Sequence, residues 1–188
     1  GAPLQQGVVG GISLDPGDAL AAALELKNYE FNAQGVEMNQ RYRSSAVVDD
    51  PDLGEEIWDR DPELYLRAAL RPGAKLPHAW VVDESGHRVS TLDLVGHGRF
   101  TLVTGVAGRA WVEAVEAIDR PLLGLAVVGG AGARDLYGYW ARVRDIDEGG
   151  ALLVRPDGYI AWRRSGALGE GESAEELLRS VLADVLGQ

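Results

Sequence analysis

FTLVTG (100–105), AGRAWVEAVEAID (107–119) and LLGLAVVGG (122–130) follow one another in the chain and decide its fold class. The first and third segments are short apolar runs rich in strand-forming residues, a pattern typical of buried β-strands. The segment between them has apolar residues at helical spacing, which would share one helical face: Trp111, Ala114, Val115 and Ile118. Together the three segments predict one β-α-β unit.

Further elements follow this unit. Asp135 is expected to cap a helix whose apolar residues share one face: Leu136, Tyr139, Trp140 and Val143. ALLVRPDGYIAWRR (151–164) then contains two strand-like runs on either side of Pro156-Asp157-Gly158. Because proline and glycine supply the backbone angles that a tight turn needs, this segment predicts a β-hairpin.

The last segment carries clear helix signals at both ends. Ser173 and Glu176 have the spacing of a capping box, apolar residues follow at helical period, and Gly187 ends the pattern. The order of elements is therefore β-α-β-α-β-β-α, which places helices on both faces of a small mixed sheet. This is the order of a thioredoxin-like domain, so we predict an α/β fold of that class.

The N-terminal part is expected to be an extension of this domain. Residues 1–14, GAPLQQGVVGGISL, carry no charge and four glycines, and we interpret them as a leader with little structure of its own. A helix is expected to begin at Asp15, with Pro16 at its first position. The apolar face of this helix requires a partner surface.

An acidic stretch separates the extension from the domain. DDPDLGEEIWDRDPE (49–63) holds eight acids and two prolines, which predicts a solvated connector. A divalent-cation site is the alternative, but the acids lack the alternation and the glycine of a calcium loop. We therefore divide the chain into an extension (1–48), an acidic connector (49–70) and a thioredoxin-like domain (71–188).

Composition excludes several classes of function. The chain has 188 residues and a net charge of −11, which argues against binding to nucleic acid or to anionic lipid. It has no cysteine, which removes disulfides and thiolate chemistry and fits a cytoplasmic location. LLGLAVVGGAGA (122–133) is too short for the ~20 residues of a membrane helix. With Met38 as the single methionine and no signal peptide, we expect a soluble piece of a longer protein.

The position of a thioredoxin-type redox site contains no sulfur. Such enzymes place a cysteine at the start of the helix after the first strand, where the helix dipole lowers the pKa of the thiol. The corresponding segment is TGVAG (104–108). We therefore expect no disulfide exchange and no peroxide reduction, and we assign no catalytic, cofactor-binding or metal-binding residue to this chain.

Two glycine-rich segments resemble the beginning of the dinucleotide fingerprint G-x-G-x-x-G. Gly130-Ala131-Gly132 follows a predicted strand, but Asp135 stands where the third glycine belongs. Gly96-His97-Gly98 fails in the same way, with Thr101 at the third position. No nucleotide site is expected in either segment.

The histidines and serines do not form a recognisable catalytic motif. The histidines at 78, 87 and 97 lack the spacing of three or four residues that places two metal ligands on one helical face. We interpret His78 as a buried, hydrogen-bonded residue that fixes a loop; a base acting with Asp83 or Asp93 is the alternative. The serines at 44, 45 and 90 lie in no G-x-S-x-G context.

Tryptophans are the remaining candidates for stacking on a ligand or anchoring a protein contact. Trp111 and Trp140 lie on predicted core faces, so we expect them to pack in the core. Trp80 and Trp162, in strand-like segments, are compatible with a core role or with an exposed one. Trp58 lies in the acidic connector.

Four long strings in the chain are NYEFNAQGVEMNQRYRSSAVV (28–48), RPGAKLPHAW (71–80), STLDLVGHGRFTLVTG (90–105) and YGYWARVRDIDEGGALLVRPDGYIAWR (137–163). Together they resemble the C-terminal part of FAD-dependent aromatic hydroxylases of the phenol hydroxylase group. The resemblance covers roughly residues 28–165. It is far more specific than any of the short motifs above.

The resemblance implies a role for this chain within a larger enzyme. In that family FAD and the phenol bind in an N-terminal region, NAD(P)H reduces the flavin, and a thioredoxin-like C-terminal domain packs against that region or a second subunit. We therefore expect a non-catalytic domain that acts in packing and homo-oligomerisation, whose N-terminal extension continues the substrate domain. The alternative is a module that binds a small aromatic ligand between the PHAW loop (77–80) and the RPDGYIAW hairpin (155–162).

Overall fold

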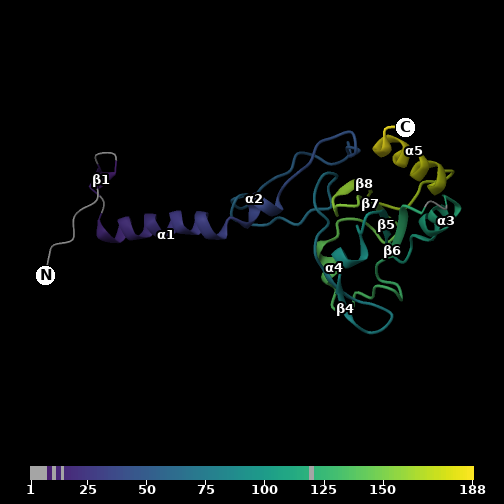
Figure 1. Ribbon diagram of the computed structural model, residues 1–188, viewed down its shortest axis with the longest axis horizontal. Helices are drawn as coiled ribbons and strands as arrows, with labels where there is room; N and C mark the ends of the chain where they lie inside the picture. Colours follow the sequence, from purple (N-terminus) through teal and green to yellow (C-terminus); the bar gives the residue numbers. More distant parts are fainter. Residues whose placement is uncertain (1–7, 10–11, 14, 119–120) are drawn as a thin grey trace. The chain divides into compact units, whose positions relative to one another are not determined.

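The computed structural model describes residues 8–9, 12–13, 15–118 and 121–188 (Figure 1). The chain divides into two compact units. The first comprises Gly1–Asn39 with Trp58–Arg67, and the second comprises Gln40–Ile57 with Ala68–Gln188. Most of the expected leader (1–14) lies outside the described residues.

The first unit is mainly helical. A short antiparallel hairpin pairs β1 (Val8–Val9) with β2 (Ile12–Ser13), and α1 (Pro16–Asn32) and α2 (Gln34–Met38) follow. The Asp15 side chain accepts a hydrogen bond from the Gly17 amide at 2.8 Å, which confirms the predicted start of the helix. None of the 17 residues of α1 is buried.

The segment Trp58–Arg67 is attached to α2 through polar contacts. The side-chain nitrogen Nδ2 of Asn39 donates to the carbonyl oxygens of Pro62, at 2.7 Å, and Tyr65, at 2.8 Å. Gly35 lies so close to the Pro62 carbonyl that a Cβ at position 35 would be 1.9 Å from its oxygen. Only glycine therefore fits at position 35.

The second unit is built on a four-stranded mixed sheet in the order β6-β5-β7-β8. Strands β5 (Phe100–Thr104) and β6 (Leu123–Val127) run parallel, and α3 (Arg109–Ile118) lies between them in the chain. Strand β7 (Ala151–Val154) is antiparallel to both β5 and β8 (Ile160–Arg164). The predicted β-α-β unit and the predicted hairpin are both confirmed, and Gly158 in the turn has a positive φ of 83°.

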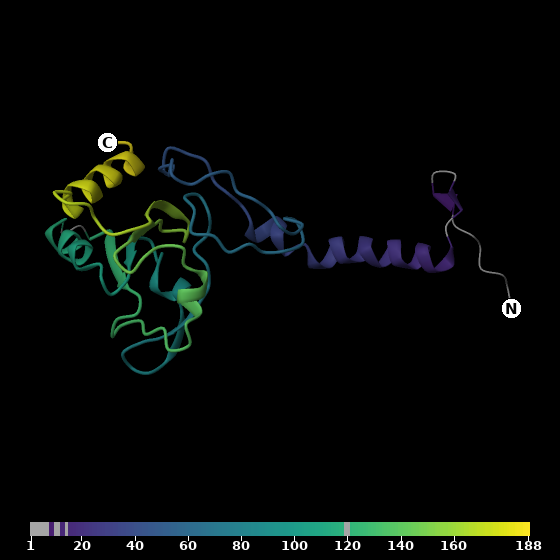
Figure 2. The same cartoon turned by 180° about the vertical axis from the view of Figure 1, so that it is seen from behind.

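Helices cover both faces of this sheet, as the order of elements predicts (Figures 1 and 2). On one face, α3 and α5 (Ala174–Leu186) pack together over the strands. That core contains Leu102, Trp111, Leu153, Leu178 and Val181, among others. The opposite face is covered by α4 (Tyr139–Val143) and the hairpin of β3 (Trp80–Val82) and β4 (Arg88–Ser90), which is followed by the 3₁₀ helix η1 (Thr91–Leu94).

The ends of α5 and the start of α4 can be compared with the capping residues that predicted them. For α5, Ser173 Oγ accepts from the Glu176 amide at 3.3 Å and Gly187 has a φ of 67°, so both predicted ends are confirmed. Helix α4 begins after Gly138, later than Asp135 had suggested. Asp135 nevertheless accepts a hydrogen bond from the Ala141 amide at 2.9 Å. Leu136 precedes the helix and is 58% exposed, so it does not join the apolar face expected of it.

Part of the acidic stretch packs against the sheet instead of being solvated. The Val48 amide, just before this stretch, donates to the Ala161 carbonyl of β8 at 2.8 Å. The side chains of Asp50 and Glu56 are each only 13% exposed, and each forms an ion pair with an arginine. The sequence interpretation missed these pairs because the arginines lie far away in the sequence.

Among the described residues, no helix has the length and apolar character needed to cross a bilayer.

Candidate functional site

Glycines and the Glu148 side chain fill the turn between β5 and α3. A Cβ on Gly105 would lie 2.3 Å from Glu148 Oε2, and a Cβ on Gly108 would lie 1.9 Å from Thr104 Oγ1. The Val106 amide donates to Glu148 Oε2 at 3.1 Å. The turn therefore has no room for a larger side chain at either glycine.

Glu148 is held as a carboxylate by its neighbours. Arg144 Nη2 lies 2.5 Å from Glu148 Oε1. The hydrogen bond from Arg144 lowers the pKa of Glu148 and the Val106 amide lowers it further, while partial burial opposes both. The geometry gives Glu148 a structural role, which is to close the turn between β5 and α3.

The elements on either side of this turn, β5 and α3, are held by buried hydrogen bonds to the segment just before β7. Thr104 Oγ1 donates to the Gly150 carbonyl at 2.7 Å, and the indole nitrogen of Trp111 donates to the Gly149 carbonyl at 3.0 Å. Trp111 is 1% exposed, so its indole satisfies a carbonyl in the core and does not reach solvent. Its predicted core role is confirmed.

A second polar cluster surrounds Arg163 on β8. Its side chain is 5% exposed and lies 3.0 Å from Asp145 Oδ2 and 3.1 Å from Asp50 Oδ2. One guanidinium nitrogen also donates to the Leu70 carbonyl at 3.2 Å. The contact with Asp50 is an ion pair by distance, because Nε of Arg163 lacks the geometry of a hydrogen bond. This buried guanidinium joins three segments of the chain and has a structural role.

His78 is hydrogen-bonded as expected, but it is exposed and not buried. Its Nδ1 lies 2.8 Å from Ser90 Oγ, and its ring meets the Trp80 ring edge-on at 4.6 Å between centroids. The PHAW loop projects this side chain from the sheet because the neighbouring Ala79 occupies the inward position. The structure therefore corrects the sequence interpretation of His78 on burial.

The two aspartates considered as partners of His78 bind backbone amides instead. Asp93 accepts from the Ser90 amide at 2.8 Å, and Asp83 accepts from the His87 amide at 2.8 Å. Ser90 Oγ caps η1 by accepting from the Leu92 amide at 3.0 Å. A serine that holds a helix end, with no aspartate orienting the histidine, does not form a catalytic triad. Among the described residues, no group of three potential metal ligands occurs either.

The glycine-rich segment after β6 does not fit a dinucleotide. Its backbone closes on itself, since the Gly129 amide donates to the Ala133 carbonyl at 2.7 Å. The chain then pairs with β3, where the amide of Arg134 donates to Val82 at 2.8 Å. A pyrophosphate is bound by the N-terminus of a helix that directly follows such a turn, and here a bridge to a strand follows.

The remaining tryptophans are distributed between core and surface. Trp140 is 3% exposed, as predicted, and Trp162, for which both roles were open, is 8% exposed and packs edge-on against Trp111. Trp80 is half-buried and lies under the Arg88 guanidinium at 4.5 Å. Trp58 is half-buried in the first unit, with the Arg67 guanidinium 5.8 Å from its ring.

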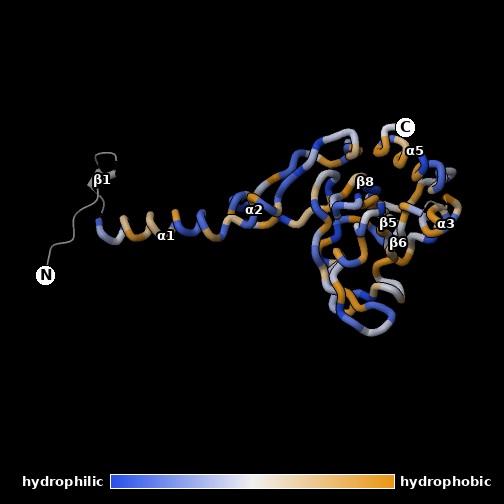
Figure 3. The backbone as a smooth tube through the Cα atoms, viewed as in Figure 1, coloured by the Kyte–Doolittle hydropathy of each residue, from blue (hydrophilic) through white to orange (hydrophobic). Residues whose placement is uncertain are grey.

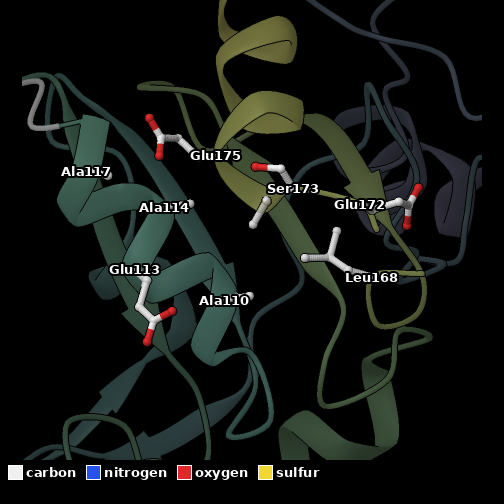
Figure 4. A pocket seen from close by; sticks show the side chains of 9 residues that line it. Ala110, Glu113, Ala114, Ala117, Leu168, Glu172, Ser173 and Glu175 are labelled. Atoms are coloured by element: carbon white, nitrogen blue, oxygen red, sulfur yellow. The ribbon is translucent and has the colours of Figure 1, made fainter. Parts of the chain in front are cut away.

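A hollow of about 330 Å³ lies between α3 and the start of α5 (Figure 4). Three carboxylates line it, from Glu113, Glu172 and Glu175. Each carboxylate has an arginine partner: Glu113 pairs with Arg109, Glu172 with Arg164 and Glu175 with Arg179. Because these charges are already paired, the hollow does not offer the free carboxylates that a cation would need.

Comparison with known proteins decides the family. The family model described as "Aromatic-ring hydroxylase, C-terminal" matches residues 69–188, which is more than half of the chain. The chain belongs to this family. The hydroxylase C-terminal domain thus occupies most of the second unit, including the whole four-stranded sheet.

Curated relatives of this chain are much longer than it is. It is 50% identical over 174 residues to 2,4-dichlorophenol 6-monooxygenase of Delftia acidovorans, which covers 89% of the chain and 28% of that enzyme. It is 43% identical over 160 residues to phenol 2-monooxygenase of a Pseudomonas species, which covers 83% of the chain and 26% of the enzyme. The chain therefore spans less than a third of these relatives.

Solved structures agree with this assignment. The flavin-dependent monooxygenase PieE, in complex with FAD and substrate, matches with a TM-score of 0.77 and 46% identity over 91% of this chain and 29% of that one. Aklavinone-11 hydroxylase, with FAD and aklavinone, matches with a TM-score of 0.64 and 38% identity, covering 79% and 26%. The chain corresponds to the C-terminal part of these larger FAD monooxygenases.

Proposed function

We propose that this chain is a thioredoxin-like, non-catalytic domain of a cytoplasmic flavin hydroxylase that acts on phenolic rings with NAD(P)H. Its role is to pack against the flavin-binding region of that enzyme and to support homo-oligomerisation. The sheet order β6-β5-β7-β8, with helices on both faces, supports the thioredoxin-like assignment. The boundaries at 1–48, 49–70 and 71–188 belong to the same proposal.

The observation that carries the packing role is the exposure of α1. The helix has 17 residues and none is buried, while Leu20 is 62% exposed, Leu24 61% and Phe31 75%. Figure 3 shows the apolar stretches along this helix. Most helical stability in proteins comes from packing an apolar face, and large exposed apolar patches mark contact sites. The flavin-binding region, present in the longer relatives, is the surface that would cover it.

The proposed absence of catalysis rests on the chemistry of the described residues. The turn between β5 and α3 is filled by Glu148, the His78–Ser90 pair has no orienting aspartate, and the glycine-rich segment after β6 does not fit a pyrophosphate. FAD would therefore bind outside these residues. The four hollows lined by residues of α3 and α5, of β6 and of the acidic segment are not lined by both the PHAW loop and the RPDGYIAW hairpin, so they give no support to the alternative of an aromatic-ligand module.

The test is a titration of the purified chain with FAD, followed by flavin fluorescence. We expect no saturable quenching, and stoichiometric quenching would overturn the proposal. Titration with 2,4-dichlorophenol, followed by tryptophan emission, tests the ligand-binding alternative in the same sample. For the packing role, we expect Leu24→Glu to reduce the binding of an apolar fluorescent dye. Leu136→Glu, at an exposed leucine of the second unit, is the matched control.

A further inference from the structure

Strand β6 is an edge of the sheet, because it pairs with β5 alone among the described strands. At the two ends of this pairing, the Phe100 amide donates to Leu122 O at 2.8 Å and the Val128 amide donates to Thr104 O at 2.9 Å. In a parallel pair, alternate residues direct both backbone groups toward the neighbouring strand. Gly124 and Ala126 therefore face β5 with their backbone groups. Leu123, Leu125 and Val127 direct theirs toward the free edge.

The sequence of this edge strand lacks the features that normally prevent edge-to-edge pairing, and the nearby charge of Arg99 lies beside Gly124, whose backbone groups face β5. Natural edge strands carry charged residues, prolines or bulges, or they are covered. The sequence of β6 is LGLAV, with no charge and no proline, whereas β8 at the opposite edge ends in Arg163 and Arg164. Leu125 is 36% exposed, and Leu122, directly before the strand, is 67% exposed.

Two hollows border the same edge, and the first of them is apolar. One, of about 190 Å³, is lined by apolar residues from β5, β6 and α5, which are Phe100, Leu122, Leu123, Leu182 and Leu186, together with Pro121. The other, of about 280 Å³, is lined by Leu94, Leu125, Val127 and Ala133, among others. Unpaired backbone groups beside apolar hollows are the arrangement by which a sheet accepts an added strand.

We propose that β6 pairs antiparallel with β6 of a second copy of this chain, with the two-fold axis at Leu125. The inference rests on the proposed oligomerisation role and assigns it a surface. In this register Leu125 faces Leu125 of the other copy, Leu123 faces Val127, and Gly124 faces Ala126. The three residues with outward backbone groups then exchange their hydrogen bonds in pairs, and the two sheets become one continuous sheet.

Self-complementarity is the reason for choosing a second copy as the occupant. A two-fold interface brings the same patch of both subunits together, so it must match its own reverse. When two copies of LGLAV run antiparallel about the central leucine, every position has an apolar or small residue opposite another apolar or small residue. Each copy carries a net charge of −11, so most surfaces would repel on self-association, while this strand contributes no charge.

The test is the mass of the chain in solution by light scattering after size exclusion, from micromolar to millimolar concentration. We expect the mass to rise from monomer to dimer with concentration. Leu125→Lys would place two like charges opposite each other at the axis, and we expect it to remain a monomer. Leu136→Lys, the same change at an exposed leucine outside the strand, should dimerise as the unchanged chain does.

Amide hydrogen exchange reports the register without any substitution. In the dimer we expect the amides of Leu123, Leu125 and Val127 to exchange slowly at high concentration and faster on dilution. Those of Gly124 and Ala126, already bonded to β5, should not depend on concentration. Because the chain lacks cysteine, Leu125→Cys adds a single thiol, and a short bis-maleimide should link two copies through it but not through Leu136→Cys.

The outcomes separate this inference from the proposed function. A chain that stays monomeric at all concentrations, or a dimer that survives Leu125→Lys, overturns the β6 pairing. Either result excludes the β6 pairing with a second copy, while the proposed packing against the flavin-binding region is unaffected because it rests on the exposed helix α1. Binding of FAD by this chain would instead overturn the proposed function, whatever its oligomeric state.

Discussion

The Nε atom of Arg163 on strand β8 lies 3.1 Å from Oδ2 of Asp50 in the acidic segment, and both side chains are largely removed from solvent. Asp145 and the Leu70 carbonyl complete the surroundings of the guanidinium. A buried charge is tolerated only when it is paired, so this contact fixes where the acidic segment lies on the sheet.

Replacement of Arg163 by alanine should therefore destabilise the domain strongly. It would leave Asp50 without its partner and remove packing of the side-chain stem, and loss of one partner of a buried pair costs about 3 kcal/mol. Urea unfolding followed by tryptophan emission measures the change. Arg109→Ala, at a pair whose arginine side chain is 88% exposed, is the matched control and should change little. Equal effects of the two variants would contradict the buried role.

Truncation of Trp111 should be the more costly of two tryptophan substitutions. Trp111→Ala would open a cavity in the core between α3, α5 and the sheet, and it would leave the Gly149 carbonyl without its donor; large aromatic truncations cost about 4 kcal/mol. Trp80→Ala, at a half-buried site, should cost less than half as much. Thermal unfolding by circular dichroism compares the two. A small loss of stability in Trp111→Ala would contradict this prediction, because it would mean that neighbouring side chains fill the cavity.

Gly105→Ala should destabilise the domain although alanine is a small residue. Its Cβ would lie 2.3 Å from Glu148 Oε2 and 2.6 Å from the Glu148 carbonyl oxygen, so the backbone at Glu148 must move. Overpacking of this kind costs about 2 kcal/mol. Gly54→Ala has nothing within 4 Å of the added carbon and serves as the control. A Gly105→Ala variant as stable as the control would show that the turn has space for a side chain.

Acid should weaken the domain partly through Glu148. Its pKa is lowered in the folded state, so its contribution to stability is fully present above the unfolded pKa of about 4.3 and is lost as the pH falls through the lower folded value. Glu148→Gln should therefore make stability less dependent on pH below about 5, where an unfolded glutamate begins to bind a proton. The effect is measured as the unfolding midpoint at steps of ~1 pH unit from pH 3 to pH 7, a range that includes the pKa of an unfolded glutamate. Glu170→Gln removes the same charge at an exposed carboxylate and is the matched control.

Elements with strong local signals were predictable from the sequence. The capping pair Ser173 and Glu176, the glycine at 187 and the apolar period of α5 agree with one another, and the structure has the helix at that place. The turn at Gly158 and the two strands beside it are a second example. The start of helix α4 could not be read from Asp135 alone. Asp135 accepts a hydrogen bond from the Ala141 amide inside the helix, but a turn separates the aspartate from the first helical residue.

The candidate sites were less predictable than the elements. Burial of Trp162 and exposure of His78 depend on which face of the sheet or loop meets a neighbouring layer. Spacing along the chain does not contain that information. The motif test on the sequence predicts no nucleotide site at the glycine segment 130–132, and in the structure the Gly129 amide donates to the Ala133 carbonyl across that segment.

The sequence by itself determined the α/β class, the helices and hairpin of the C-terminal half and the resemblance to aromatic-ring hydroxylases. These properties depend on local periodicity, capping residues and long matching strings, each of which lies within a continuous stretch. Only the tertiary structure decided that Asp50 pairs with Arg163, that Glu148 closes the turn after β5, and that β6 is left at an edge. Those relationships join residues that are distant in the chain, and their partners are selected by packing and burial once the layers have assembled.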